Sequence, residues 1–200
     1  MANNLPGGWM VTKEGLRPPA TLTSVMLAAS LAASLGAATL EKLELDQMIL
    51  KSTEIVRGKV TAKAAATRGA VIYTEVSVSV TERLKGATSP SVRVSVPGGT
   101  LNGVTQTFPG SPDLHTGSEY VFFLWTGKSG VTQIVGLSQG LLDLDGSLGA
   151  ASGTAKLSRA AITAGLVDPV TGKAVADQPL TLTLDKLRAR VSAVLGASRQ

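Results

Sequence analysis

The chain has 200 residues and a formal net charge of +5, and its residues are 16% charged, 44% hydrophobic and 4% aromatic. This length suffices for one domain with a real core, and the composition excludes an intrinsically disordered chain, which needs low hydrophobicity and high net charge. The chain contains no cysteine, which excludes a disulfide framework and a lipid-anchored cysteine. Its basic residues are scattered, so charge alone gives little support for a polyanion-binding footprint.

Residues 1–38 are predicted to be a secretory signal peptide. The stretch 21–38 carries no charge, Lys13 and Arg17 precede it, and small residues ending in Ala37 and Ala38 close it. A basic region, an apolar region and a small-residue cleavage site in this order are typical of export signals. Two alternatives stay open, an uncleaved membrane anchor and a buried helix. With cleavage, we expect a secreted or periplasmic protein that is not attached to a membrane.

The next elements are an amphipathic helix and a series of strands. Apolar residues at helical spacing predict a helix within 40–53 that ends near Ser52. Period-two alternation or continuous apolar runs predict strands at 54–62, 71–84, 91–96, 119–125, 131–137 and 139–144. Gly58 inside the first strand indicates a bulge or a close crossing of another backbone. Asn102-Gly103 predicts a tight turn within a looser strand at 100–108, and 109–117 is expected to be a loop.

The end of the chain is expected to be a long loop followed by a helix. Residues 146–179 are rich in Gly, Ala, Ser and Thr, with one short strand expected at 155–159. Thr183 is expected to cap the last helix, with Asp185 in its first turn and Gly196 just beyond its end. The predicted organisation is a signal peptide (1–38), a β-domain (39–145), a loop (146–179) and a C-terminal helix that packs on the β-domain (180–200). The fold class is mainly β, a barrel or small sandwich of five to six strands.

Few residues in the sequence are typical of catalysis or metal binding. His115 is the only imidazole, and a local triad with Ser111 and Asp113 would require the base to lie between its two partners, which one short loop does not favour. Asp143 and Asp145 resemble only the start of a calcium loop. We therefore predict no enzymatic activity, no metal and no cofactor. The aromatic residues of 120–125 are predicted to be core, with a stacking platform for bases or sugars as the alternative.

Five segments of the chain resemble a known module. In order they are EIVRGKVTA, IYTEVSVSVTERLKG, VRVSVPGG, GSEYVFFLW and TQIVGLSQG, within about 54–140. This series is similar to the netrin-like module in the amino-terminal half of tissue inhibitors of metalloproteinases, and still more to a set of secreted bacterial proteins. The resemblance implies a five-stranded barrel of the oligonucleotide/oligosaccharide-binding (OB) type with helices outside. In the inhibitors an amino-terminal cysteine chelates the protease zinc, and this chain, expected to start at Thr39 after cleavage, has no cysteine.

The leading functional hypothesis is a binding module that recognises a protein partner, a protease being one candidate, through loops on a rigid barrel. The expected partner-binding residues lie in two loops, 97–102 and 109–115: Gly98, Gly99, Asn102, Asp113 and His115. The alternative hypothesis is a polyanion, glycan or nucleic-acid binder with contacts from Arg57, Lys59 and Arg93. Lys186, Arg188 and Arg190 are expected to be solvated, with a ligand-facing basic patch as the alternative.

Overall fold

A computed structural model describes residues 39–145, 153–163 and 165–198. The chain divides into two units, Met1–Leu35 and Gly36–Gln200, and the description below concerns the second. The predicted signal peptide lies outside the described residues and stays a prediction. In the part of the chain that is described, no helix has both the length and the apolar character needed to cross a membrane.

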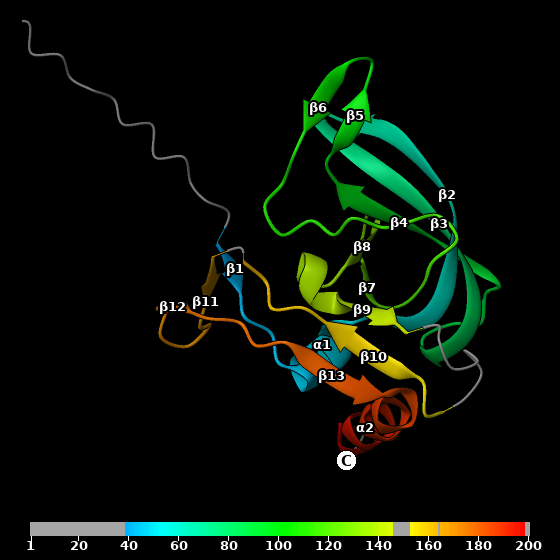
Figure 1. Ribbon diagram of the computed structural model, residues 1–200, viewed down its shortest axis with the longest axis vertical. Coiled ribbons are helices and arrows are strands. Elements are labelled where there is room, and N and C mark those ends of the chain that lie inside the picture. Colours follow the sequence, from blue (N-terminus) through cyan, green and yellow to red (C-terminus); the bar gives the residue numbers. More distant parts are fainter. Residues whose placement is uncertain (1–38, 146–152, 164, 199–200) are drawn as a thin grey trace, which may run out of the picture. The chain divides into compact units, whose positions relative to one another are not determined.

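The main element is an eight-stranded sheet (Figure 1), which confirms the mainly-β prediction. Its strand order is β13-β10-β9-β7-β2-β3-β4, and β8 also pairs with β7. The longer strands are β2 (Glu54–Arg68), β3 (Val71–Lys85), β4 (Ser91–Pro97) and β7 (Glu119–Thr126). The shorter strands are β8 (Thr132–Ile134), β9 (Leu141–Leu144), β10 (Lys156–Arg159) and β13 (Leu180–Thr183). A 3-10 turn, η1 (Leu137–Gly140), links β8 to β9.

The β2–β3 pair is longer and more irregular than predicted. β2 continues six residues past the predicted end at Ala62, since the long alternating β3 offers a partner up to the turn at Gly69. The register shifts at three places, one of them directly beside Gly58. A Cβ at Gly58 would lie 2.7 Å from the backbone oxygen of Ser79, so both the bulge and the close backbone approach predicted there are confirmed.

Strand β7 is buried on both faces, as its continuous apolar sequence predicts. Phe123 belongs to a core formed with the two helices, which we call the helix-side core, and Phe122 to a second core between the curled strands, the curl-side core. Buried members of the helix-side core include Met48, Ile49, Ile55, Val121, Leu142, Leu157, Leu184, Leu187 and Val191. Buried members of the curl-side core include Val56, Val60, Val76, Val78, Val94, Val96, Leu114, Tyr120, Leu124 and Ile134.

The sheet curls but does not close into a barrel. β4 comes close to β8, yet no backbone pairing joins them among the described residues. The order β8-β7-β2-β3-β4 therefore forms an open, strongly bent sheet whose concave face holds the curl-side core, as in a small sandwich. Of the two predicted architectures, the structure is consistent with the sandwich.

The N-terminal helix is shorter than predicted. Leu40–Glu41 forms strand β1, which pairs with β11 (Leu166–Val167), and helix α1 spans only Leu45–Lys51. The cause is a capping box, in which Glu44 and Gln47 satisfy each other's backbone amides and start the helix there. The predicted end near Ser52 is confirmed, because Ser52 is the C-cap and its hydroxyl donates to the Met48 carbonyl.

The segment predicted as a long loop carries more structure than one strand. Strand β10 agrees with the expected strand, but β11 and β12 (Ala174–Val175) form an additional hairpin that pairs with β1. An Asx turn shapes this hairpin, since Asp168 accepts hydrogen bonds from the Val170 and Thr171 amides. These short two-residue strands have no alternation to reveal them in the sequence.

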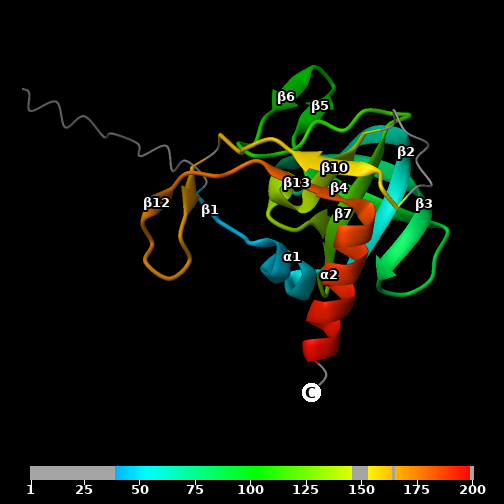
Figure 2. The same cartoon turned by 60° about the horizontal axis from the view of Figure 1, so that its bottom comes forward.

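Helix α2 (Leu184–Ala197) packs beside α1 (Figure 2). Thr183 caps it by accepting a hydrogen bond from the Lys186 amide, and Asp185 lies in its first turn, as predicted. The helix does not stop before Gly196, which was expected to follow its end. Gly196 keeps a right-handed backbone, and the Ser198 amide still donates to Val194.

Candidate functional site

The two loops predicted to bind a partner line one common pocket of about 310 Å³. Residues 97–99 and 111–114 form part of its wall, and strands β3 and β4 form its base. We call it the loop pocket; its lining comprises Lys63, Thr74, Val76, Val96, Pro97, Gly98, Gly99, Gln106, Thr107, Phe108, Ser111, Pro112, Asp113 and Leu114. Three of the five residues expected to bind a partner, Gly98, Gly99 and Asp113, are among them.

Hydrogen bonds hold both loops against the sheet. The Ser111 hydroxyl donates to the Pro97 carbonyl at 2.8 Å and so ties one loop to the other. The Gly98 amide donates to Ile72, and the Thr74 hydroxyl donates to the Gly98 carbonyl at 2.8 Å. The Ser138 hydroxyl fixes the other loop by donating to the Gly110 carbonyl at 2.6 Å. The pocket is therefore preformed, which lowers the entropy cost of binding.

Glycine is required where β4 turns into the pocket wall. Gly98 and Gly99 have φ values of 103° and 142°, which side chains rarely adopt. A Cβ on Gly99 would also lie 2.7 Å from the Thr74 hydroxyl oxygen. These two residues thus end the strand, bring the backbone close to β3 and leave the pocket open.

The pocket combines an apolar base with one ion pair at its rim. Val76, Val96 and Leu114 belong to the curl-side core, and each is buried. Lys63 donates to the Leu114 carbonyl at 2.6 Å and lies 3.7 Å from the exposed Asp113 carboxylate. The apolar base suits binding of an apolar group, and the Ser111 hydroxyl at the wall is bonded to the Pro97 carbonyl.

Asn102 and His115 do not line this pocket. Asn102 forms the tip of the hairpin β5 (Gly99–Leu101) and β6 (Val104–Gln106) with Gly103, and both have positive φ, so the predicted tight turn is confirmed. His115 lines a separate hollow with Lys59. Residues from the two functional hypotheses are therefore brought together there, while Ser111 and His115 line different hollows.

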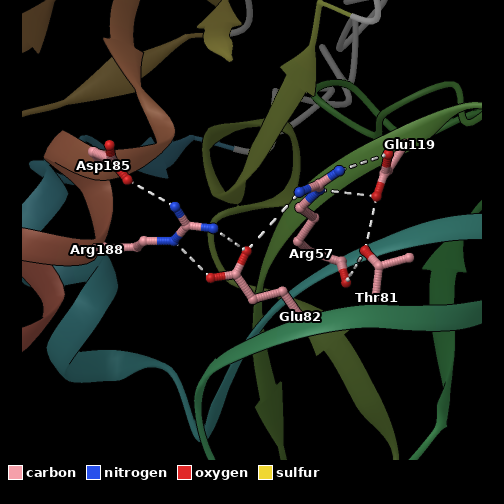
Figure 3. A network of polar contacts seen from close by, with 6 residues as sticks. All are labelled: Arg57, Thr81, Glu82, Glu119, Asp185 and Arg188. Atoms are coloured by element: carbon pink, nitrogen blue, oxygen red, sulfur yellow. Dashed lines mark hydrogen bonds and ion pairs between the residues drawn. The ribbon is translucent and has the colours of Figure 1, made fainter. Parts of the chain in front are cut away.

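Arg57 is not an exposed polyanion contact. Its side chain is 8% exposed and makes a two-point ion pair with Glu119, with Nε at 2.9 Å from Oε1 and Nη2 at 3.2 Å from Oε2 (Figure 3). The Thr81 hydroxyl donates to the same Glu119 carboxylate at 2.7 Å. The burial of Arg57 corrects the expectation that this residue is an exposed polyanion contact. A buried arginine requires carboxylate partners, and here other strands provide them.

The same network anchors helix α2 to the sheet. Arg188 donates from Nε and Nη2 to the two oxygens of Glu82, at 2.7 and 2.8 Å, and from Nη1 to Asp185 (Figure 3). The hydrogen bonds from Arg188 to Glu82 and Asp185 raise the pKa of this guanidinium above its usual range. Arg190 similarly pairs with Asp46 of α1. Arg188 is therefore tied to the sheet, whereas Lys186 and Arg190 are exposed, as expected for a solvated helix face.

A register shift places Glu82 in this network. Strict alternation would point Glu75 and Glu82, seven residues apart, to opposite faces. The bulge skips Thr81, so that Val80 lies opposite Gly58 and Glu82 opposite Arg57. Glu82 is thereby turned to the same side as Glu75, whose carboxylate accepts from Ser95 and Arg68.

Lys59 and Arg93 are exposed and make no ion pair within the described part of the chain. They lie on the same sheet face, opposite Ser79 and Ser77 of the intervening strand. Because Arg57 is buried, only Lys59 and Arg93 contribute positive charge to this face, which is too little for a basic patch. No cluster of three or more side chains able to hold a metal ion occurs among the described residues, and the calcium-like segment continues at Gly146 outside them.

Trp125 departs from the prediction for its strand. Tyr120, Phe122 and Phe123 are core as predicted, but Trp125 is 48% exposed. Strand β7 extends past the end of the buried core at Trp125, and the residue pattern alone does not reveal where the core ends.

Comparison with known proteins adds no assignment. No family model and no curated protein matches this chain.

Proposed function

We propose that this protein is a secreted or periplasmic, non-enzymatic binding module that recognises a protein partner through the loops around the loop pocket. The observation that carries the proposal is that two loops, one on each side of the β5–β6 hairpin, are hydrogen-bonded to each other and line one preformed apolar pocket. Pockets of this kind accept the aromatic or aliphatic anchor residues that dominate protein interfaces. The resemblance to the netrin-like module makes a protease one candidate partner.

The arrangement of β8, β7, β2, β3 and β4 supports this resemblance without deciding it. β4 approaches β8, as the implied barrel requires, although the two strands are not paired. The polyanion alternative has less support, because Arg57 is buried in ion pairs and only Lys59 and Arg93 of its three contacts are exposed.

The test is affinity capture of partners by the tagged chain from the secreted fraction of its own cells, washed at low and high salt. A matched pair of variants sharpens it. Thr107→Trp places a bulky side chain on an exposed residue that lines the pocket, whereas Val104→Trp changes an exposed residue of the adjacent strand β6 that does not line it. We expect a salt-resistant protein partner that Thr107→Trp loses and Val104→Trp keeps.

Recovery of nucleic acid or acidic polysaccharide alone, released by high salt, would contradict the proposal and favour a polyanion binder. If both variants retain the partner equally, the partner binds at a surface other than the loop pocket. Export is measured in the same cells, by the presence of the tagged chain outside the cytoplasm.

A further inference from the structure

A second hollow lies beside the start of the described chain, apart from the loop pocket. Its volume is about 530 Å³, within the range of small-molecule sites. The chain stem 39–43 and the strands β7 and β8 form its walls. We call it the tryptophan groove; the residues used in the argument are Glu41, Leu43, Lys51, Trp125 and Gln133.

The indole of Trp125 packs against Gly127. A Cβ on Gly127 would lie 2.9 Å from the indole Cη2 and 3.3 Å from Cζ3, so the ring lies directly over this glycine. The backbone of Gly127 does not have the positive φ that would otherwise explain a glycine there. The absence of a side chain at Gly127 therefore leaves room for the half-exposed tryptophan ring, whose remaining surface is an apolar platform.

Two hydrogen bonds of Gln139 fix the facing wall of the groove. The buried Gln139 donates to the Glu41 carbonyl at 2.9 Å and accepts from the Leu43 amide at 2.8 Å. Because these bonds join the stem to η1, the groove has its shape before any ligand arrives.

The polar groups around the platform define the ligand's chemistry. Gln133 lies directly opposite Trp125 in the β7–β8 pair, and its amide both donates and accepts hydrogen bonds. Glu41 and Lys51 lie on the rim as an exposed ion pair, 3.9 Å apart, so these two side chains add no net charge to the rim. A complementary ligand has an apolar face, several hydroxyl groups and no charge.

We propose that the tryptophan groove binds a neutral oligosaccharide, with one pyranose ring stacked on Trp125 and its hydroxyls bonded to Gln133, Glu41 and Lys51. A pyranose presents C–H groups on its flat face and hydroxyls at its edge, which is the combination that this groove offers. A polyanion gains no net attraction from this ion pair, and a proline-rich peptide would use the ring but leave the rim groups unpaired. The site is independent of the loop pocket and of the function proposed for it.

Tryptophan fluorescence tests this directly. The chain has two tryptophans, Trp9 and Trp125, so the full chain with Trp9→Phe reports on Trp125 alone. It is titrated into the millimolar range with cellohexaose, xylohexaose, maltohexaose and hexa-N-acetylchitohexaose, and with poly-L-proline. We expect a saturable change in emission with at least one of the saccharides and a weaker effect, or none, with poly-L-proline.

Variants locate the binding, measured by calorimetry with the saccharide that binds. Trp125→Ala should lower the affinity at least about tenfold, and Gln133→Ala by a smaller factor. Gly127→Ala should weaken binding by displacing the ring while the protein stays folded, as circular dichroism checks. Val104→Ala, also an exposed apolar position, is the control and should bind as the parent does. A flat titration with all four saccharides, preferential binding of poly-L-proline, or unchanged affinity in Trp125→Ala would each overturn the proposal.

Discussion

The two faces of strand β7 are enclosed in different ways. The helix-side core is covered by α1 and α2, and two buried ion pairs lie at its border. Arg57, which pairs with Glu119, follows Ile55 on the same face of β2. Arg159, which pairs with Asp177, follows Leu157 on the same face of β10. The curl-side core is enclosed by the bend of the sheet and by the loops of the loop pocket. Buried ion pairs thus fix the helix-side face, whereas the loop pocket opens on the curl-side face.

The largest effect is expected from emptying either core at β7. Phe123→Ala removes a fully buried ring from the helix-side core and Phe122→Ala one from the curl-side core. Each should lower the free energy of unfolding by about 3–5 kcal/mol, as measured by urea denaturation. If the comparison holds, only Phe122→Ala should also weaken partner capture. Equal loss of capture in both variants would show that the two faces are not independent.

A smaller effect is expected from the arginine pairs. Arg57→Met leaves the carboxylates of Glu119 and Glu82 without their buried cation and should cost about 2–3 kcal/mol in urea denaturation. Arg93→Met, an exposed arginine on β4, is the matched control and should change stability by less than about 0.5 kcal/mol. Similar costs for the two variants would contradict a special role for burial.

The pair of Arg159 and Asp177 should make the helix-side face sensitive to acid. Burial of the Asp177 carboxyl opposes its ionisation, but hydrogen bonds from Arg159 and the Ile162 amide outweigh burial and lower its pKa. A folded-state pKa below the unfolded value stabilises the fold above the unfolded pKa, and that stability is lost as the pH falls through the folded pKa. Asp177→Asn should cost about 1–3 kcal/mol at neutral pH.

The control for this prediction is the pH dependence itself. Urea midpoints of the parent should approach those of Asp177→Asn as the pH falls below the usual aspartate range. A constant difference between the two proteins at all pH values would contradict the assignment.

The smallest effect is expected at the cap of α2. Thr183→Ala removes the side-chain acceptor for the Lys186 amide and should cost about 1 kcal/mol. The loss should appear as a lower thermal midpoint with partner capture unchanged, because α2 covers only the helix-side core. Loss of partner capture in Thr183→Ala would contradict the prediction that the two faces of β7 act independently.

Much of the sheet could be predicted because its signals are local. The alternation of β3, the continuous apolar run of β7 and the cap at Thr183 are each contained within one element. The burial of Arg57 could not be predicted, because its carboxylate partners lie 25 and 62 positions further along the chain. The side of β3 on which Glu82 lies could not be predicted for a related reason, since a bulge that depends on the partner strand reverses the alternation after Thr81. The two loops could be predicted from the sequence, but the residues that line a common pocket could not, because that depends on how the loops pack against the sheet.

The gap between β4 and β8 also bears on how this protein behaves at high concentration. A strand edge with free amides and carbonyls is a template on which another chain can add a strand, the first step of many aggregates. Here the free edges of β4 and β8 lie close to each other, and β4 ends in Pro97, which has no amide hydrogen to offer. The incomplete closure therefore conceals both edges from neighbouring molecules, so the bent sheet resists aggregation without the continuous hydrogen bonding of a barrel.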